Sequence, residues 1–175
     1  MKKGLFLILI GLCCTVFSFN CFASNYALHV WGYNSTSVDI NLYNLSSVYS
    51  TAFSNAKSSW NNVDTPCSIY SSPYSSNYIY DIAYNSTYLS QYLVYENDYT
   101  DPDHITTRFN IKINNNYVMT MQTQEKGSII AHEIGHAFGL NDYDAVSTVL
   151  MSHTRNRYSL YSPKTGDIEG VNASW

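Results

Sequence analysis

Apolar and polar residues alternate along two segments of the chain, which predicts two half-buried strands. The first segment is YALHVWGY at 26–33. The second is RFNIKIN at 108–114, where apolar Phe109, Ile111 and Ile113 alternate with polar neighbours. Further strands are expected near 67–70 and 78–84, where β-branched and aromatic residues gather.

Helical spacing of apolar residues predicts two longer helices. Residues 47–63 carry apolar side chains about four positions apart, namely Val48, Ala52, Ala56 and Trp60. This spacing is typical of an amphipathic helix. A second helix is expected over about 124–140, and a short closing helix from about Thr165.

The stretch from Tyr70 to Tyr99 holds nine tyrosines among serines and asparagines. Apolar periodicity is lacking, and Pro73 argues against a continuous helix. The pattern favours strands and loops with half-buried tyrosines. The alternative is an aromatic surface that binds sugars or peptides.

The first 23 residues combine Lys2 and Lys3 with a long apolar run that ends at Ala23. This combination predicts a secretory signal at 1–23, followed by one domain at 24–175. We therefore expect a secreted protein of bacterial origin with no membrane anchor after signal removal. An uncleaved helix is the alternative.

Removal of that signal leaves an acidic chain with one cysteine. Seven basic residues then face thirteen acidic ones, a formal charge of minus six, which disfavours nucleic acid as a partner. Cys67 is left alone, so an intramolecular disulfide is not expected. The lone thiol favours a buried small hydrophobe over a reactive group.

The segment HEIGHAFGLND at 132–142 carries the candidate chemistry. On a helix, His132 and His136 lie on one face, one turn apart, and can hold one zinc ion through their ring nitrogens. Glu133 is placed to take a proton from water that the zinc has made more acidic. These groups suffice for hydrolysis of an amide.

A third zinc ligand is expected after the helix ends. Gly139 tolerates the left-handed conformation that ends helices, and the turn can bring Asp142 back to the metal. Two histidines and one aspartate leave the fourth zinc position open for catalysis. Asp144 and His153 are alternative third ligands.

H-E-x-x-H-x-x-G-x-x-D resembles the extended zinc signature of the metzincin peptidases, with an aspartate as in the snapalysin-type members. The segment STVLMSH resembles the Met-turn of that family, which implies that Met151 lies beneath the zinc. The tail from Tyr161 to Trp175 is similar to the closing helix of matrixin catalytic domains.

The resemblance implies an α+β fold: a metzincin-like catalytic domain with a twisted mixed β-sheet, two long helices and a small C-terminal lobe after the zinc helix. It implies a secreted, monomeric, zinc-dependent endopeptidase in which Glu133 activates the zinc-bound water. Protein or peptide substrates would add a strand to a sheet edge, at 108–114 or 92–98. His153 and Tyr158 are possible transition-state or pocket residues, and the specificity pocket is expected around 152–161.

Other readings stay open at this point. One is a metzincin-like binding module with a tyrosine-rich surface and little catalysis, and another is a zinc hydrolase that acts on something other than protein. The short distance between Ala23 and the first strand argues against an inhibitory propeptide. An acidic group can bind calcium, although a solvated turn around Pro102 is favoured; its members are Glu96, Asp98, Asp101 and Asp103.

Overall fold

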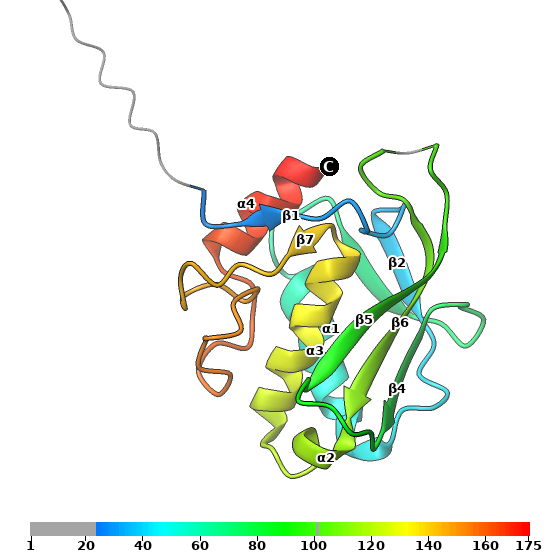
Figure 1. The fold of residues 1–175 in the computed structure, drawn as a ribbon, viewed down its shortest axis with the longest axis vertical. Helices are drawn as coiled ribbons and strands as arrows, with labels where there is room; N and C mark the ends of the chain where they lie inside the picture. The colour runs from blue at the N-terminus through cyan, green and yellow to red at the C-terminus, as the bar shows by residue number, and fades with distance from the viewer. Residues whose placement is uncertain (1–23, 101) are drawn as a thin grey trace, which may run out of the picture.

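A computed structural model of the chain describes residues 24–100 and 102–175 (Figure 1). The expected signal at 1–23 and Asp101 of the acidic group lie outside the described residues. The described elements follow in the order β1 (Ala27–Leu28), β2 (Ser37–Ile40), η1 (Ser47–Tyr49), α1 (Ser50–Asn61), β3 (Ser68–Ser71), β4 (Tyr78–Ile82), β5 (Ser90–Asn97), β6 (Thr106–Asn114), α2 (Asn115–Val118), α3 (Thr123–Ala137), β7 (Leu140–Asn141) and α4 (Thr165–Ser174). Within the described residues, a helix of the length and hydropathy that a membrane crossing requires is not found.

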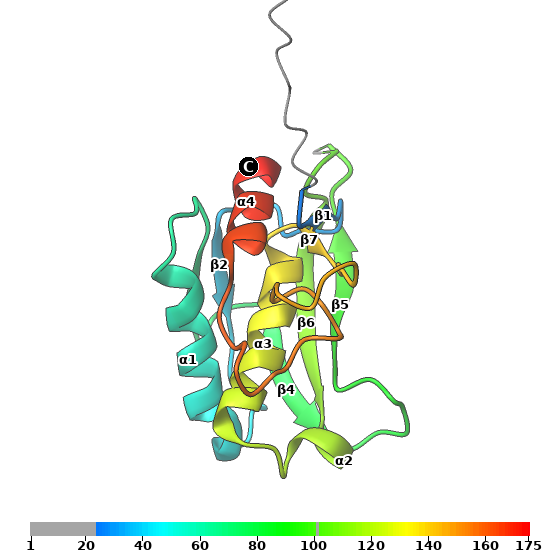
Figure 2. The same cartoon turned by 90° about the vertical axis from the view of Figure 1, so that its left-hand side faces the viewer.

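The helix α1 packs along α3 and fixes its position (Figure 2). Three of its predicted apolar positions, Ala52, Ala56 and Trp60, are buried. The fourth, Val48, was placed wrongly, because it lies in the 3-10 turn η1 and is 49% exposed. The indole Nε1 of Trp60 donates to the Ala131 carbonyl oxygen at 2.8 Å, so a buried hydrogen bond ties the two helices together.

The alternating segment at 108–114 lies in the centre of a three-stranded sheet. This strand, β6, pairs with β4 in parallel and with β5 antiparallel. Its apolar residues Phe109, Ile111 and Ile113 are fully buried, as the alternation predicts. Of the two expected edge segments, the structure therefore places 92–98, in β5, at the edge.

The expected single twisted sheet was wrong. The described strands form three separate sheets: β4-β6-β5, the parallel pair β2-β3, and the antiparallel pair β1-β7. The physical reason is that a side-chain amide bonds to the backbone groups that β2 and β6 would otherwise use to pair with a neighbouring strand. Oδ1 of Asn77 accepts from the Phe109 amide of β6 at 3.0 Å, while its Nδ2 donates to the Asp39 carbonyl oxygen of β2 at 3.2 Å. A single bridge, between Asn41 and Tyr78, joins β2–β3 to this sheet among the described residues.

The expected small lobe after the zinc helix is also corrected. The short strand β7 returns to pair with β1, and α4 packs against both (Figure 1). Buried Leu140 and Val171 hold this packing in the main core. The segment after α3 is thus part of the body of the molecule, and the metzincin-like architecture predicted from the sequence does not describe this fold.

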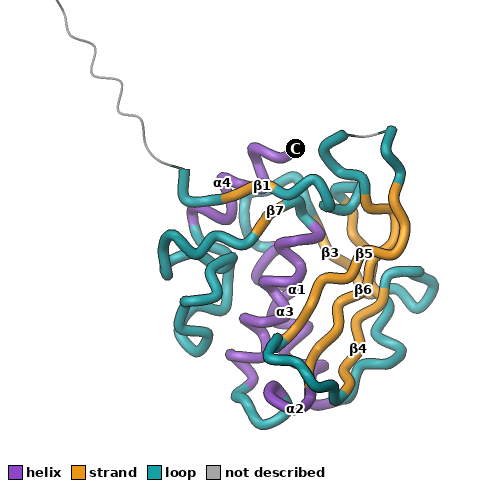
Figure 3. Tube along the Cα trace, viewed as in Figure 1, coloured by secondary structure: helices purple, strands orange, loops and turns teal. Residues whose placement is uncertain are grey.

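The tyrosine-rich stretch forms strands and loops, as predicted (Figure 3). Tyr92 is largely buried and packs on Phe109, with ring centroids 4.9 Å apart. Several other tyrosines of the stretch are exposed rather than half-buried: Tyr70, Tyr74, Tyr88, Tyr95 and Tyr99. These aromatic rings lie in contact with solvent on the sheet and its loops.

Cys67 lies in the core, just before β3. Burial raises the pKa of its thiol to about 12, so the thiol stays neutral at physiological pH. This agrees with the favoured interpretation of Cys67 as a small buried hydrophobe.

Candidate metal centre

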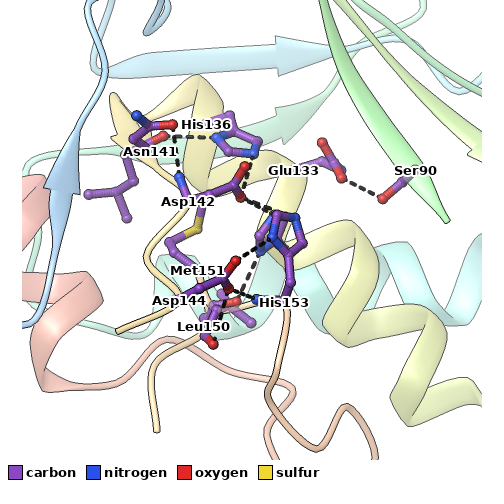
Figure 4. Close-up of polar contacts among 12 residues, drawn as sticks. Ser90, Glu133, His136, Asn141, Asp142, Asp144, Leu150, Met151 and His153 are labelled. Atoms are coloured by element: carbon purple, nitrogen blue, oxygen red, sulfur yellow. Dashed lines mark hydrogen bonds and ion pairs between the residues drawn. The ribbon is translucent and has the colours of Figure 1, made fainter. Parts of the chain in front are cut away.

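The helix α3 carries the two histidines and the glutamate of the opening motif (Figure 4). His132 and Glu133 are each only 4% exposed. The rings of His132 and His136 lie edge to face, with centroids 4.9 Å apart. The helical spacing therefore brings both imidazoles to one face, as the sequence predicts.

Backbone carbonyls orient both imidazoles. Nδ1 of His132 lies 3.1 Å from the Leu150 carbonyl oxygen, and Nδ1 of His136 lies 2.8 Å from the Leu140 carbonyl oxygen. A carbonyl only accepts, so each Nδ1 carries the proton and each Nε2 presents a lone pair. Nη1 of Arg155 lies 3.3 Å from Nδ1 of His132. That longer contact joins two donors, so we assign the proton to the bond with Leu150.

Asp142, in the turn after α3, completes the set of candidate metal ligands. Gly139 has φ of 91°, the left-handed conformation predicted for it, and the chain reverses there. Oδ1 of Asp142 then lies 3.0 Å from Nε2 of His132 and 3.6 Å from Nε2 of His136. Burial alone raises the pKa of Asp142, but the hydrogen bond and the positive charge that His132, His136 and His153 provide when they are protonated outweigh it and lower the pKa to about 2.

The two rival ligands form a pair of their own. Oδ2 of Asp144 lies 3.1 Å from Nδ1 of His153, and Oδ1 of Asp144 accepts from the His153 amide at 2.6 Å. Nε2 of His153 therefore points into the site, 3.4 Å from Oδ1 of Asp142. Asp144 therefore orients the His153 ring rather than serving as a candidate metal ligand itself.

The donor atoms suit zinc, which prefers imidazole nitrogen and carboxylate oxygen. Ligand atoms of His132, Asp142 and His153 all lie within 4.8 Å of one another, and Nε2 of His136 faces the same Asp142 oxygen. Two histidines with Asp142 make a three-ligand site with one open position. His153, whose side chain is 51% exposed, flanks that position.

Glu133 points away from the imidazoles toward β5 (Figure 4). Its Oε1 accepts a hydrogen bond from the Ser90 hydroxyl at the start of that strand. Two cavities, of about 130 Å³ and 290 Å³, meet at Glu133 and His132. The carboxylate thus stands beside the group of ligand atoms and within reach of a molecule bound in either cavity.

Met151 lies against α3 at Gly135, the residue before His136. A Cβ atom added to Gly135 would lie 2.4 Å from Sδ of Met151, so the sulfur touches the helix backbone. Buried Asp167 of α4 fixes this turn by accepting from the Leu150 amide at 2.8 Å and the Met151 amide at 3.1 Å. Burial raises the pKa of Asp167, even though three backbone amides favour its charged form.

Sequence reasoning missed several residues of the site. Ser90, His29 and Arg155 line the cavities but carry no motif, because the fold brings them in from distant segments. Asp167 had a weak signal as an acidic residue in the first turn of a predicted helix. Tyr158, expected near the site, is 54% exposed and is not among the residues that line the two cavities.

The acidic group proposed for calcium is only partly described. Glu96 pairs with Arg108 at 3.1 Å, and Oδ1 of Asp98 accepts from the Thr100 amide at 3.0 Å. Asp101 lies outside the described residues. The calcium expectation therefore stays a prediction.

Comparison with known proteins gives a likeness of fold. The chain matches a chain of the GM1-bound form of the ECX AB5 holotoxin with a TM-score of 0.52 and 15% sequence identity, over 86% of this chain and 86% of that chain. No protein-family model matches the sequence. No curated protein matches it either. At 15% identity, the likeness concerns the fold alone.

These comparisons correct the family assignment made from the sequence motifs. A solved structure that the chain resembles is a holotoxin chain, and no family model, metzincin or matrixin included, matches. The short HExxHxxGxxD and Met-turn segments resembled those families over a small part of the chain, which was too little to establish membership. The assignment to metzincins and matrixins is withdrawn, and metalloprotease activity no longer follows from family membership.

Proposed function

We propose that this chain is an exported, monomeric, zinc-dependent hydrolase that cleaves peptide bonds. One observation carries the proposal: imidazole nitrogens and a carboxylate oxygen face one another, with Glu133 beside them at the meeting point of two cavities. The same donors without such a carboxylate would suit a structural metal site equally well. A base next to an open position is the arrangement that hydrolysis requires.

His132, His136 and Asp142 would hold the zinc, which when bound supplies Lewis acidity to a water and to the substrate carbonyl. Ser90 fixes Oε1 of Glu133, so Oε2 is the oxygen left to take the proton of the attacking water. Glu133 then returns that proton to the leaving amine. The edge strand β5 offers its backbone groups to an extended peptide, which would pair as an additional strand beside Glu133.

The test is hydrolysis of casein by the zinc-loaded protein, with and without a chelator. We expect cleavage that the chelator abolishes. Glu133→Ala should keep the zinc and the fold but lose nearly all turnover, because it removes the proton acceptor and no ligand. Glu169→Ala, at an exposed position of α4, is the matched control and should cleave normally. Substantial turnover in Glu133→Ala would refute the role of this base.

A binding module is the second candidate function. Its support is the likeness of fold to a chain of the GM1-bound holotoxin, together with the exposed tyrosine rings, of which Tyr74 is 95% exposed and Tyr99 is 72% exposed. Aromatic faces of this kind stack on sugars. This candidate predicts glycan binding that survives Glu133→Ala and is lost in Tyr74→Ser with Tyr99→Ser, with casein left intact by the wild type.

A further inference from the structure

Two arginines line the smaller of the two cavities beside Glu133. Its volume is about 130 Å³, and both Glu133 and His132 line it. Its lining comes from three parts of the chain: the segment that leads into β5, the helix α3, and the segment after Met151. The cavity lining includes Leu89, Ser90, Ile129, His132, Arg155 and Arg157.

Arg155 is a buried cation on which the carboxylates of Glu133, Asp167 and Asp142 act only from beyond ion-pair distance. It is 4% exposed, and its guanidinium donates to neutral oxygens: the Ser128 hydroxyl at 3.0 Å, the Ser128 carbonyl at 3.0 Å and the Ser152 carbonyl at 2.6 Å. Among the described residues, Arg155 has no carboxylate within 4.0 Å. Burial lowers its pKa to about 10, so it stays charged at neutral pH. A buried charge of this kind is costly unless an anion accompanies it.

Arg157 adds a second cation to the same cavity. It is half-buried, and its Nη2 donates to the His153 carbonyl oxygen at 3.0 Å. Arg155 and Arg157 line the same cavity, so their two guanidinium groups lie near each other. Among the described residues, no carboxylate lies within 4.0 Å of Arg157 either. Two arginines and one carboxylate, that of Glu133, therefore line one small cavity, which leaves an excess of one positive charge.

We propose that this cavity binds a carboxylate of the substrate, next to the bond that is cleaved. The carboxylate belongs either to an aspartate or glutamate side chain or to the C-terminus of the peptide. Arginine guanidinium groups match carboxylates in geometry and charge. This inference rests on the proposed function, because it names the substrate class of the same site.

The size and the remaining walls fit this ligand. A cavity of about 150 Å³ holds a group the size of benzene, so 130 Å³ suffices for an acidic side chain. Leu89 and Ile129 give the apolar surface against which the methylene stem of a glutamate would pack. The charged head would then lie toward Arg155 and Arg157, which line the same cavity.

The test measures binding to zinc-loaded Glu133→Ala, so that turnover does not enter the result. Three labelled peptides share one sequence: an amidated peptide with Glu at the varied position, its amidated Gln counterpart, and the Gln peptide with a free C-terminus. We expect the Glu peptide or the free acid to bind at least about tenfold more tightly than the amidated Gln peptide. The first result identifies a side-chain carboxylate and the second a terminal one. Equal binding of all three, or no measurable binding, overturns the proposal.

Arginine variants link the preference to this cavity. Adding Arg157→Gln to Glu133→Ala should reduce the preference to about threefold or less, and adding Arg157→Glu should make a Lys-containing peptide the tighter ligand. Arg108→Gln, on β6 and outside the cavity, is the control and should keep the preference. Zinc content and circular dichroism verify that each variant is folded. A preference that is unchanged in both Arg157 variants would place the carboxylate elsewhere and overturn the proposal.

Cleavage by the wild type separates this inference from the proposed function. Cleavage of a peptide mixture without enrichment of acidic residues or free C-termini at the cut would overturn the carboxylate site and leave the hydrolase intact. Carboxylate-dependent binding without any cleavage would overturn the hydrolase and leave the carboxylate site as a binding site.

Discussion

Oδ1 of Asp142 lies 3.0 Å from Nε2 of His132, across the turn that ends α3. The contact joins two residues ten positions apart, and the left-handed Gly139 makes it possible. His153 approaches the same oxygen at 3.4 Å, so distance alone leaves two candidates for the third ligand. Their surroundings differ, because Asp142 is held between two buried or half-buried imidazoles, while the His153 side chain is half exposed.

Zinc affinity should therefore depend more on Asp142 than on its neighbours. We expect Asp142→Ala to lose most of the zinc and Asp142→His to retain some. His153→Ala and Asp144→Ala should cost at most about 10- to 100-fold, the range for residues that orient ligands. Competition with a chromophoric chelator measures the four affinities. Near wild-type affinity in Asp142→Ala, with loss of zinc in His153→Ala, would reverse the assignment.

Met151 should tolerate a change of shape but not of polarity. Met151→Leu keeps the approximate volume and should cost less than about 1.5 kcal/mol in the free energy of unfolding. Met151→Asp would bury an unpaired charge against α3 and should prevent folding of the site. Urea denaturation and zinc content are the measurements. Normal zinc binding in Met151→Asp would contradict the placement of this side chain.

Two glycines of α3 provide a matched pair for packing against that methionine. At Gly135 an added Cβ would lie 2.4 Å from Sδ of Met151, whereas at Gly127 the nearest atom would be 3.5 Å away. Gly135→Ala should destabilise the protein by about 1–3 kcal/mol through overpacking, less the gain in helix propensity. Gly127→Ala should be neutral or stabilise by up to about 1 kcal/mol. Equal effects in the two variants would show that Met151 moves aside freely.

Acid should weaken the zinc-free protein through His29. Burial, followed by the charge of His136, lowers the pKa of His29 from 6.5 to about 4. The unfolded chain therefore binds more protons between these values, so the stability is complete above about pH 6.5 and falls as the pH drops toward 4. His29→Gln should flatten this part of the curve. The melting temperature of the chelated protein against pH is the measurement, and parallel curves for wild type and variant would exclude His29 as the cause.

The sequence predicted the parts of the site that depend on local geometry. Helical spacing alone brings His132 and His136 together, and the glycine rule alone predicts the turn at Gly139. Ser90 and Arg155 reach the site only through tertiary packing, 43 and 23 residues from their partners Glu133 and His132. Periodicity cannot detect such contacts.

The fold was harder to predict for a similar reason. The buried strand β6 and both long helices follow from apolar periodicity. The separation of β2–β3 from the three-stranded sheet depends on where Asn77 directs its side-chain amide, and this polar residue looks like an ordinary loop position in the sequence. Family resemblance drawn from two short motifs then suggested an architecture that the strands do not form.

The close packing of Met151 sulfur on the backbone of Gly135 has a consequence for oxidative damage. An oxygen atom added to that sulfur finds no room in the closed molecule, since Met151 is only 2% exposed and the helix lies against it. Peroxide can therefore convert Met151 to its sulfoxide only while the turn is open, and an oxidised turn cannot close again. The rate at which this sulfoxide forms would therefore report how often the turn that carries Met151 opens.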